Sequence, residues 1–133
     1  MTRGVKPKQI VAASSPARKV PPAPSGLSKE AKAEWRRVAP ILHKRNTLDA
    51  ADYPTLEAYC VHFSVIRQAQ RSIDDLGLVL PDGKRNPAYG ALKESSLLLV
   101  RCAGELGLTP SARSRASVME ATDDDDDNPL TVR

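Results

Sequence analysis

Two helix boundaries and the helix between them can be read from residues 86–115, NPAYGALKESSLLLVRCAGELGLTPSARSR. Asn86 followed by proline is a typical helix start, because the asparagine side chain caps the first turn and proline needs no hydrogen-bond partner there. Gly107 can adopt the left-handed conformation that ends a helix. Thr109 and the proline after it repeat the start signal, so a short second helix is predicted to follow.

The long helix predicted from Asn86 to Leu106 is apolar on more than one side. Apolar or small residues recur every three or four positions and form one seam. The members of this seam are Tyr89, Leu92, Ser96, Leu99, Ala103 and Leu106. Leu97, Leu98 and Val100 lie outside the seam, and a small domain has little material to cover a helix on every side. We therefore expect these three residues to pack between subunits of an oligomer; the alternative is a central helix buried inside a monomer.

A second long helix is predicted upstream, from Asp49 or a few residues later to Leu76. Asp49 and Asp52 can form a capping arrangement, but Pro54 follows too closely for a regular first turn. Positions spaced by three and four residues form a coiled-coil seam, which we expect at a subunit interface. This seam consists of Leu56, Tyr59, Phe63, Ile66, Gln70 and Ile73. Gln70 either faces solvent at the end of the seam or sets the register and subunit number.

A shorter helix is predicted to begin after Ser28 and to end at residues 45–47. Its two faces differ in character, as expected for a helix on the surface of a core. The apolar face carries Ala31, Trp35, Val38, Ala39 and Leu42. The opposite, basic face carries Lys29, Lys32, Arg36, Arg37 and Lys44. Glu30 and Glu34 lie between the two faces, and Pro40 lies on the polar side.

The fold class expected from these elements is all-α. The two long helices form a central antiparallel hairpin, with one short helix before it and one after it. Residues 78–85, LVLPDGKR, are expected to form a small β-hairpin or an ordered loop between the long helices. A chain of 133 residues supports one modest domain, which association with further subunits would stabilise.

Charge divides the chain into three parts around a net charge of +4. Residues 1–26 are rich in proline and basic residues and are expected to form a disordered arm. Residues 27–120 are expected to form the helical domain for oligomerisation and DNA binding. Residues 121–133 contain the acidic run 123–127 and are expected to form a disordered tail. A basic arm and an acidic tail suggest a polyanion partner at one end and a protein partner at the other.

The residue types that catalysis or metal binding requires are not arranged for either. Cys60 and Cys102 fall inside predicted helices and are expected to be buried free thiols. Together with His43 and His62 they lack the spacing of a zinc site, and the sequence contains no catalytic triad pattern or glycine-rich phosphate loop. We therefore expect no enzyme activity, no cofactor and no metal. No apolar run is long enough to span a membrane, which indicates an intracellular protein.

Basic residues in three places are candidates for phosphate contacts. The arm is a better candidate than a helix surface, since an unpaired basic segment gains affinity for DNA by releasing counterions. Its basic residues are Arg3, Lys6, Lys8, Arg18 and Lys19. The basic face of the first helix either contacts phosphates or is an ordinary solvated surface. Arg113 and Arg115 either reach a DNA groove, if the last two helices form a helix-turn-helix, or pair with acids of an adjacent subunit.

The acidic tail has two alternative roles. It either keeps the protein soluble and shields its basic surface, or it is a recognition peptide whose charges are followed by one apolar anchor. The residues concerned are Asp123, Asp124, Asp125, Asp126, Asp127 and Leu130.

These residues together resemble the small subunit of a tailed-phage terminase, in the lineage with the signature LGLTPSARSR. The resemblance covers about residues 21–116. Its most specific part is AGELGLTPSARSR at 103–115, and LSKEAKAEWRRVAPIL at 27–42 is moderately specific. Further matches are Leu48, Asp52, Tyr59, Cys60, Gly77, Asn86 and Pro87.

The resemblance implies a non-enzymatic component of the genome-packaging motor in the host cytoplasm. Members of that family bind double-stranded viral DNA at the packaging start site, form rings of about eight to eleven subunits and regulate a large ATPase and nuclease subunit. Carried onto this chain, DNA contact falls on the arm, the basic face of the first helix, and Arg113 and Arg115. The large subunit meets a terminal segment at 123–133. The alternatives are a head-assembly adaptor that binds only proteins and a small helix-turn-helix transcriptional regulator.

Overall fold

The computed structural model describes residues 19–115. The elements in order are α2 (Lys29–Lys44), the short 3-10 helix η1 (Ala50–Asp52), α3 (Tyr53–Leu76) and α4 (Ala88–Glu105). Residues 110–115 are also helical, and the described part contains no strand, which confirms the all-α prediction. The predictions for Arg3, Lys6, Lys8 and Arg18 and for the tail from Asp123 to Leu130 lie outside the described residues.

The helix α2 begins where the sequence predicted. Ser28 has an extended backbone, and its Oγ accepts a hydrogen bond from the Ala31 N–H at 3.2 Å. This bond satisfies one of the amide groups that the first turn leaves without a partner. The predicted apolar face is buried throughout. It consists of Ala31, Trp35, Val38, Ala39 and Leu42.

The helix α3 begins at Tyr53, after a separate turn. Asp49 and Asp52 form the expected capping box, but this box caps η1 and not the long helix. Pro54 therefore falls in the first turn of α3, where the missing amide costs nothing. The helix ends at Leu76, and Gly77 has a φ of 81°, as expected for the residue that stops a helix.

The connection between α3 and α4 is an ordered loop closed by one isolated antiparallel β-bridge, between Val79 and Arg85. Its anchor is the buried side chain of Asn86, which is 3% exposed. The Asn86 Nδ2 donates to the Gly77 carbonyl at 3.0 Å, and the Oδ1 accepts from the Ala88 N–H at 3.0 Å. Asn86 therefore caps α4, as predicted, and also fixes the loop to the end of α3.

The break after α4 confirms the other boundary prediction. Gly107 has a φ of 72°, and the Leu108 N–H bonds back to the Ala103 carbonyl at 2.8 Å, which closes the end of the helix. The Thr109 Oγ1 then accepts from the Ala112 N–H at 3.2 Å. Thr109 is thus the N-cap of the short helical segment at residues 110–115.

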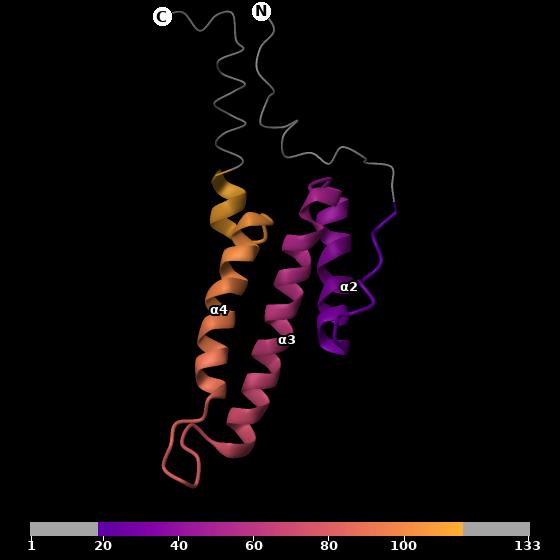
Figure 1. The fold of residues 1–133 in the computed structure, drawn as a ribbon. Helices are drawn as coiled ribbons and strands as arrows, with labels where there is room; N and C mark the ends of the chain where they lie inside the picture. Colours follow the sequence, from indigo (N-terminus) through magenta and orange to yellow (C-terminus); the bar gives the residue numbers. More distant parts are fainter. Residues whose placement is uncertain (1–18, 116–133) are drawn as a thin grey trace, which may run out of the picture.

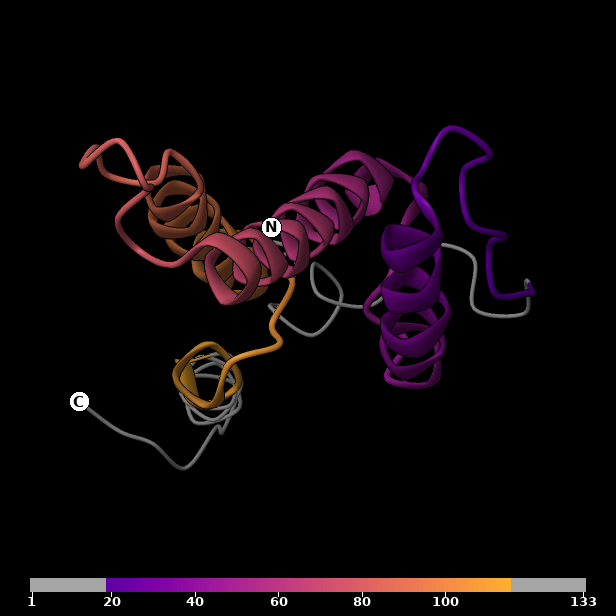
Figure 2. The same cartoon turned by 90° about the horizontal axis from the view of Figure 1, so that it is seen from below.

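Among the three named α-helices, α3 is central and packs against both of the others. In both views α3 lies between α4, which runs antiparallel beside it, and α2 (Figures 1 and 2). The core lies where α2 crosses the first half of α3, and α4 contributes Ala103 there, with Leu99, Cys102 and Leu106 packed against the core. The largest fully buried side chains are Trp35, Leu42, Leu56, Val38 and Cys60.

Two residues that were expected at a subunit interface belong to this core. Leu56 and Tyr59 are buried within the single chain, in the cluster that also contains Trp35. The prediction that they form an intersubunit seam is therefore wrong. The spacing correctly identified an apolar face of α3, but α2 of the same chain covers its first part.

The far half of the hairpin buries much less. Its buried residues are small or polar: Ala69, Ser95 and Asn86. Large apolar side chains remain exposed at the end of α3, at Leu76, on the loop, at Leu78 and Val79, and on α4, at Leu97, Leu98 and Val100. The alternative of a helix buried on all sides within a monomer is thus excluded for α4.

Candidate nucleic-acid interface on α2

The outer surface of α2 carries cations over its first half and again at its last residue. Lys29, Arg36, Arg37 and Lys44 are exposed, and Lys32 is half-buried, on the side opposite the core. Arg45, which directly follows the helix, is exposed as well and extends the same run of cations. From the sequence, Arg45 was expected only to form part of the helix end, although its charge and its place directly after Lys44 are the signal that includes it.

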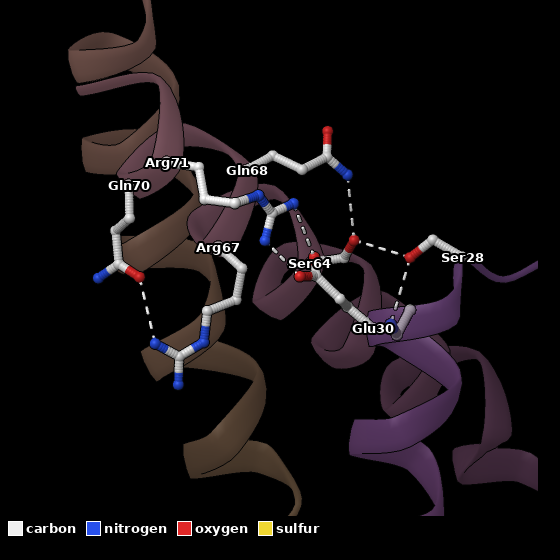
Figure 3. Close-up of polar contacts among 8 residues, drawn as sticks. Ser28, Glu30, Ser64, Arg67, Gln68, Gln70 and Arg71 are labelled. Carbon is white, nitrogen blue, oxygen red and sulfur yellow. Dashed lines mark hydrogen bonds and ion pairs between the residues drawn. The ribbon is translucent and has the colours of Figure 1, made fainter. Parts of the chain in front are cut away.

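The first acidic residue of α2, Glu30, is held toward α3. Both carboxylate oxygens accept hydrogen bonds from Arg71, with the Nη2–Oε2 distance at 3.2 Å, as Figure 3 shows. These bonds lower the pKa of Glu30 below its ordinary value and raise the pKa of Arg71. The charge of Glu30 is therefore compensated by a cation of another helix and does not neutralise the lysines beside it.

The second acidic residue, Glu34, is buried, with an exposed fraction of 3%. The carboxylate accepts hydrogen bonds from the Arg37 guanidinium, at 3.2 Å from Nη2, and from the Tyr59 hydroxyl at 3.4 Å. The bond with Glu34 raises the pKa of Arg37. Burial, and then the charge of Glu34, raises the pKa of Tyr59.

Arg37 therefore differs from the other basic residues of α2. Its side chain is 62% exposed, but its guanidinium compensates a buried carboxylate. The prediction placed Arg37 among equivalent phosphate contacts; the structure instead makes it the partner of Glu34. The basic surface of α2 is defined from here on as Lys29, Lys32, Arg36, Lys44 and Arg45.

A polar cluster fixes the position of α2 on α3. The Ser28 and Ser64 hydroxyls lie 2.7 Å apart, and the Gln68 Nε2 donates to the Ser64 Oγ at 3.2 Å (Figure 3). With the pair formed by Glu30 and Arg71, this cluster joins residues far apart in sequence. It holds the first turn of α2, and so the basic surface, in one orientation.

The segment before α2 is held against the same helix. The Trp35 Nε1 donates to the Pro21 carbonyl at 2.9 Å, and Leu27 is buried in the core. Figure 1 shows this segment running alongside α2. Lys19 lies exposed two residues before Pro21, in the segment that Trp35 holds against α2.

Arg113 and Arg115 lie elsewhere. Both are exposed, and residues 110–115 lie on the α4 side of the molecule, away from α2 (Figures 1 and 2). The Arg113 Nη1 donates to the Leu108 carbonyl at 2.9 Å and so supports the turn after α4. The structure does not bring these arginines and the basic surface of α2 into one site.

The remaining residues predicted at a subunit interface lie on the surface or close to it. Phe63, Ile66 and Ile73 are half-buried, and Leu97 and Val100 are 66% and 60% exposed. Gln70 is exposed, and its Oε1 accepts from the Arg67 Nη1 at 3.2 Å (Figure 3). Within the single chain this geometry favours the solvent-facing interpretation of Gln70.

A metal site, a reactive cysteine and a membrane-spanning helix each require particular features of the described residues. Between residues 19 and 115, no three His, Cys, Asp or Glu side chains come together as a metal site. Cys60 and Cys102 are free, and burial raises the pKa of Cys60 to about 12, so its thiol is a poor nucleophile. Among these residues, no helix combines the length and apolar character needed to cross a bilayer.

The fold and the site define a small all-helical protein that presents one basic helix surface and a separate exposed apolar surface. The phage terminase small-subunit family matches residues 31–123, which include most of α2 and all of α3 and α4. The chain belongs to this family, as the resemblance in the sequence indicated. No curated protein and no solved structure matches the chain.

Proposed function

We propose that this protein is the non-catalytic, DNA-binding component of a phage packaging terminase. It binds double-stranded viral DNA at the packaging start site and regulates the large subunit, which carries the ATPase and nuclease. The observation that supports this most directly is that neither acidic residue of α2 is available to compensate the cations on its outer surface. Because Glu30 pairs with Arg71 and Glu34 is buried, the basic surface of α2 has no acidic residue of its own helix to compensate it.

Such a surface suits the DNA backbone. A regular helix rises about 1.5 Å per residue, so the 16 residues of α2 extend over roughly 24 Å, long enough to follow several phosphates. Each cation that neutralises a phosphate releases counterions, which gives affinity that falls steeply with salt. Arg3, Lys6, Lys8, Arg18 and Lys19 precede α2 in the sequence and add to this contact.

Assembly into a ring is supported by the apolar side chains that the single chain leaves exposed. Leu97, Leu98 and Val100 lie on α4, and Val61 is exposed on α3. A closed ring needs two different surfaces on each subunit, since the contact is head-to-tail. We propose that the exposed apolar residues of α4 contact α3 of the next subunit, near Phe63, Ile66 and Ile73, in a ring of about eight to eleven subunits.

The large subunit is proposed to bind the acidic tail. Asp123, Asp124, Asp125, Asp126 and Asp127 offer charge, and Leu130 offers an apolar anchor three residues later. Arg113 and Arg115 lie before this tail and are proposed to contact DNA or the adjacent subunit.

The DNA-binding proposal is tested by fluorescence anisotropy of a labelled duplex at several salt concentrations. The variant Lys32→Gln/Arg36→Gln removes two cations from the basic surface of α2. We expect weaker binding and a salt slope smaller by about 2. The matched control, Lys84→Gln/Lys93→Gln, removes two exposed cations from the other end of the hairpin and is expected to change little.

Two outcomes would contradict this proposal. If the wild-type protein binds no duplex at low salt, a head-assembly adaptor that contacts only proteins becomes the better explanation. If both double variants lose affinity equally, binding depends on net charge and not on α2. Deleting residues 1–20 should also reduce the salt slope while Trp35 keeps its partner Pro21, and an unchanged slope would remove the arm from the site.

A further inference from the structure

The basic surface of α2 is electrostatically unfavourable when no anion covers it. Lys29 and Lys32 are three residues apart, and Lys32 and Arg36 are four apart, which places like charges side by side on a helix. Lys44 and Arg45 add two more cations at the end of the helix. Since the two acids of α2 are already paired or buried, compensation must come from outside the helix.

The chain itself contains an anion of matching charge. Residues 123–127 are five consecutive aspartates, against the five cations of the basic surface of α2. Seven residues separate this run from Arg115, and an extended chain of that length reaches at most about 25 Å. In Figure 1 the helical segment at 110–115 lies at the same end of the molecule as the end of α2, which carries Lys44 and Arg45.

We propose that the acidic run 123–127 binds the basic surface of α2, in its own chain or in the adjacent subunit, when DNA is absent. A tethered segment is present at an effective concentration on the order of millimolar, so weak individual ion pairs suffice. The contact is electrostatic and is therefore screened by salt, since the Debye length is about 10 Å at 0.1 M.

Docking of the acidic run has a consequence for DNA binding, and this part rests on the proposed function. DNA phosphates and the aspartates require the same cations, so the run competes with DNA and lowers its affinity. A partner protein that takes the acidic run would uncover the basic surface of α2. The contact would thereby couple the protein partner to DNA binding.

Docking can be tested directly in the full-length protein without DNA. A carbodiimide joins carboxylates to lysines that they touch, and mass spectrometry identifies the linked peptides. We expect links from residues 123–127 to Lys29, Lys32 and Lys44 at low salt, which disappear at about 0.5 M salt. Lys84 and Lys93 are exposed, as Lys29 and Lys44 are, and serve as internal controls. Links to these control lysines alone, or no links from the acidic run, would overturn the proposal.

Competition is tested with the variant in which Asp123 to Asp127 are all replaced by asparagine. We expect its affinity for a short duplex to rise at least about fivefold at 0.1 M salt, with the difference shrinking at higher salt. The control variant Asp74→Asn/Asp75→Asn/Asp82→Asn neutralises three exposed acids at the hairpin tip. An equal gain per removed charge in both variants would show a net-charge effect and overturn competition.

The two experiments separate the two proposals. Links to α2 in a protein that binds no DNA would support docking and contradict DNA binding. Salt-dependent DNA binding without links to α2 would support the proposed function and contradict docking.

Discussion

Tyr59 of α3 donates a hydrogen bond, 3.4 Å long, to the buried carboxylate of Glu34 on α2, whose other partner is Arg37. This contact joins the core to the basic face of α2. A buried carboxylate is tolerated only when it is paired and hydrogen-bonded. Arg37 and Tyr59 meet that requirement together, which assigns Arg37 to the stability of the helix pair.

The first prediction separates Arg37 from its neighbour Arg36. Arg37→Gln leaves Glu34 buried without its cation and is expected to cost about 1–3 kcal/mol in the free energy of unfolding. Arg36→Gln touches nothing buried and is expected to cost less than about 0.5 kcal/mol. Urea unfolding measures both. For DNA affinity we expect the reverse, with a larger loss for Arg36→Gln than for Arg37→Gln. A larger loss for Arg37→Gln would show that Arg37 also contacts phosphates.

The second prediction concerns the pH dependence of the pair between Glu30 and Arg71. The pKa of Glu30 is lowered by Arg71, so the pair stabilises the folded protein above the ordinary glutamate pKa of 4.5 and loses its effect as the pH falls through the lowered value. Glu30→Gln should therefore lower the urea midpoint slightly at pH 7, and the difference from wild type should vanish at acidic pH. Glu94→Gln, at an exposed site on α4, is the control and should show no such dependence.

The third prediction concerns Asn86, which joins the end of α3 to the start of α4. Asn86→Ala removes both the bond to Gly77 and the cap on Ala88, and is expected to cost about 1–2 kcal/mol in the free energy of unfolding. Asn86→Asp keeps the accepting oxygen but loses the donor, so its loss should be smaller. Equal losses in urea unfolding would show that the cap contributes nothing.

Local signals in the sequence predicted the helix boundaries correctly, except at the start of α3, where the predicted box of Asp49 and Asp52 caps η1 instead. Ser28, Gly77, Asn86, Gly107 and Thr109 all act where they were expected to, because caps and left-handed glycines depend only on nearby backbone. The apolar face of α2 was also correct, since amphipathic periodicity is a property of one helix.

The sequence could not predict which element packs against each helix face, nor the features that depend on that packing. The spacing of Leu56 and Tyr59 showed an apolar face, but it could not show that α2 of the same chain covers it. Glu34 was placed between two faces, and only the crossing of α3 buries it. The partner of Glu30 is 41 residues away in sequence, so the helical periodicity of α2 could not show which of its acidic residues pair with a cation of another helix.

The fourth prediction tests whether the exposed apolar residues of α4 form the subunit contact. Leu97 and Val100 are three residues apart on one exposed face, at 66% and 60% exposure, so Leu97→Gln/Val100→Gln removes apolar contact area without opening a cavity in the chain. Association should weaken strongly while the single chain keeps its helical content, as measured by sedimentation and circular dichroism. The matched control, Leu78→Gln/Val79→Gln, changes two exposed apolar residues of the loop. If the α4 variant keeps the full mass of the assembly in solution, the subunit contact lies elsewhere. If only the loop variant dissociates, the loop between α3 and α4 is the interface. Either result locates the contact, because the apolar surface that assembly buries from water is what holds the subunits together.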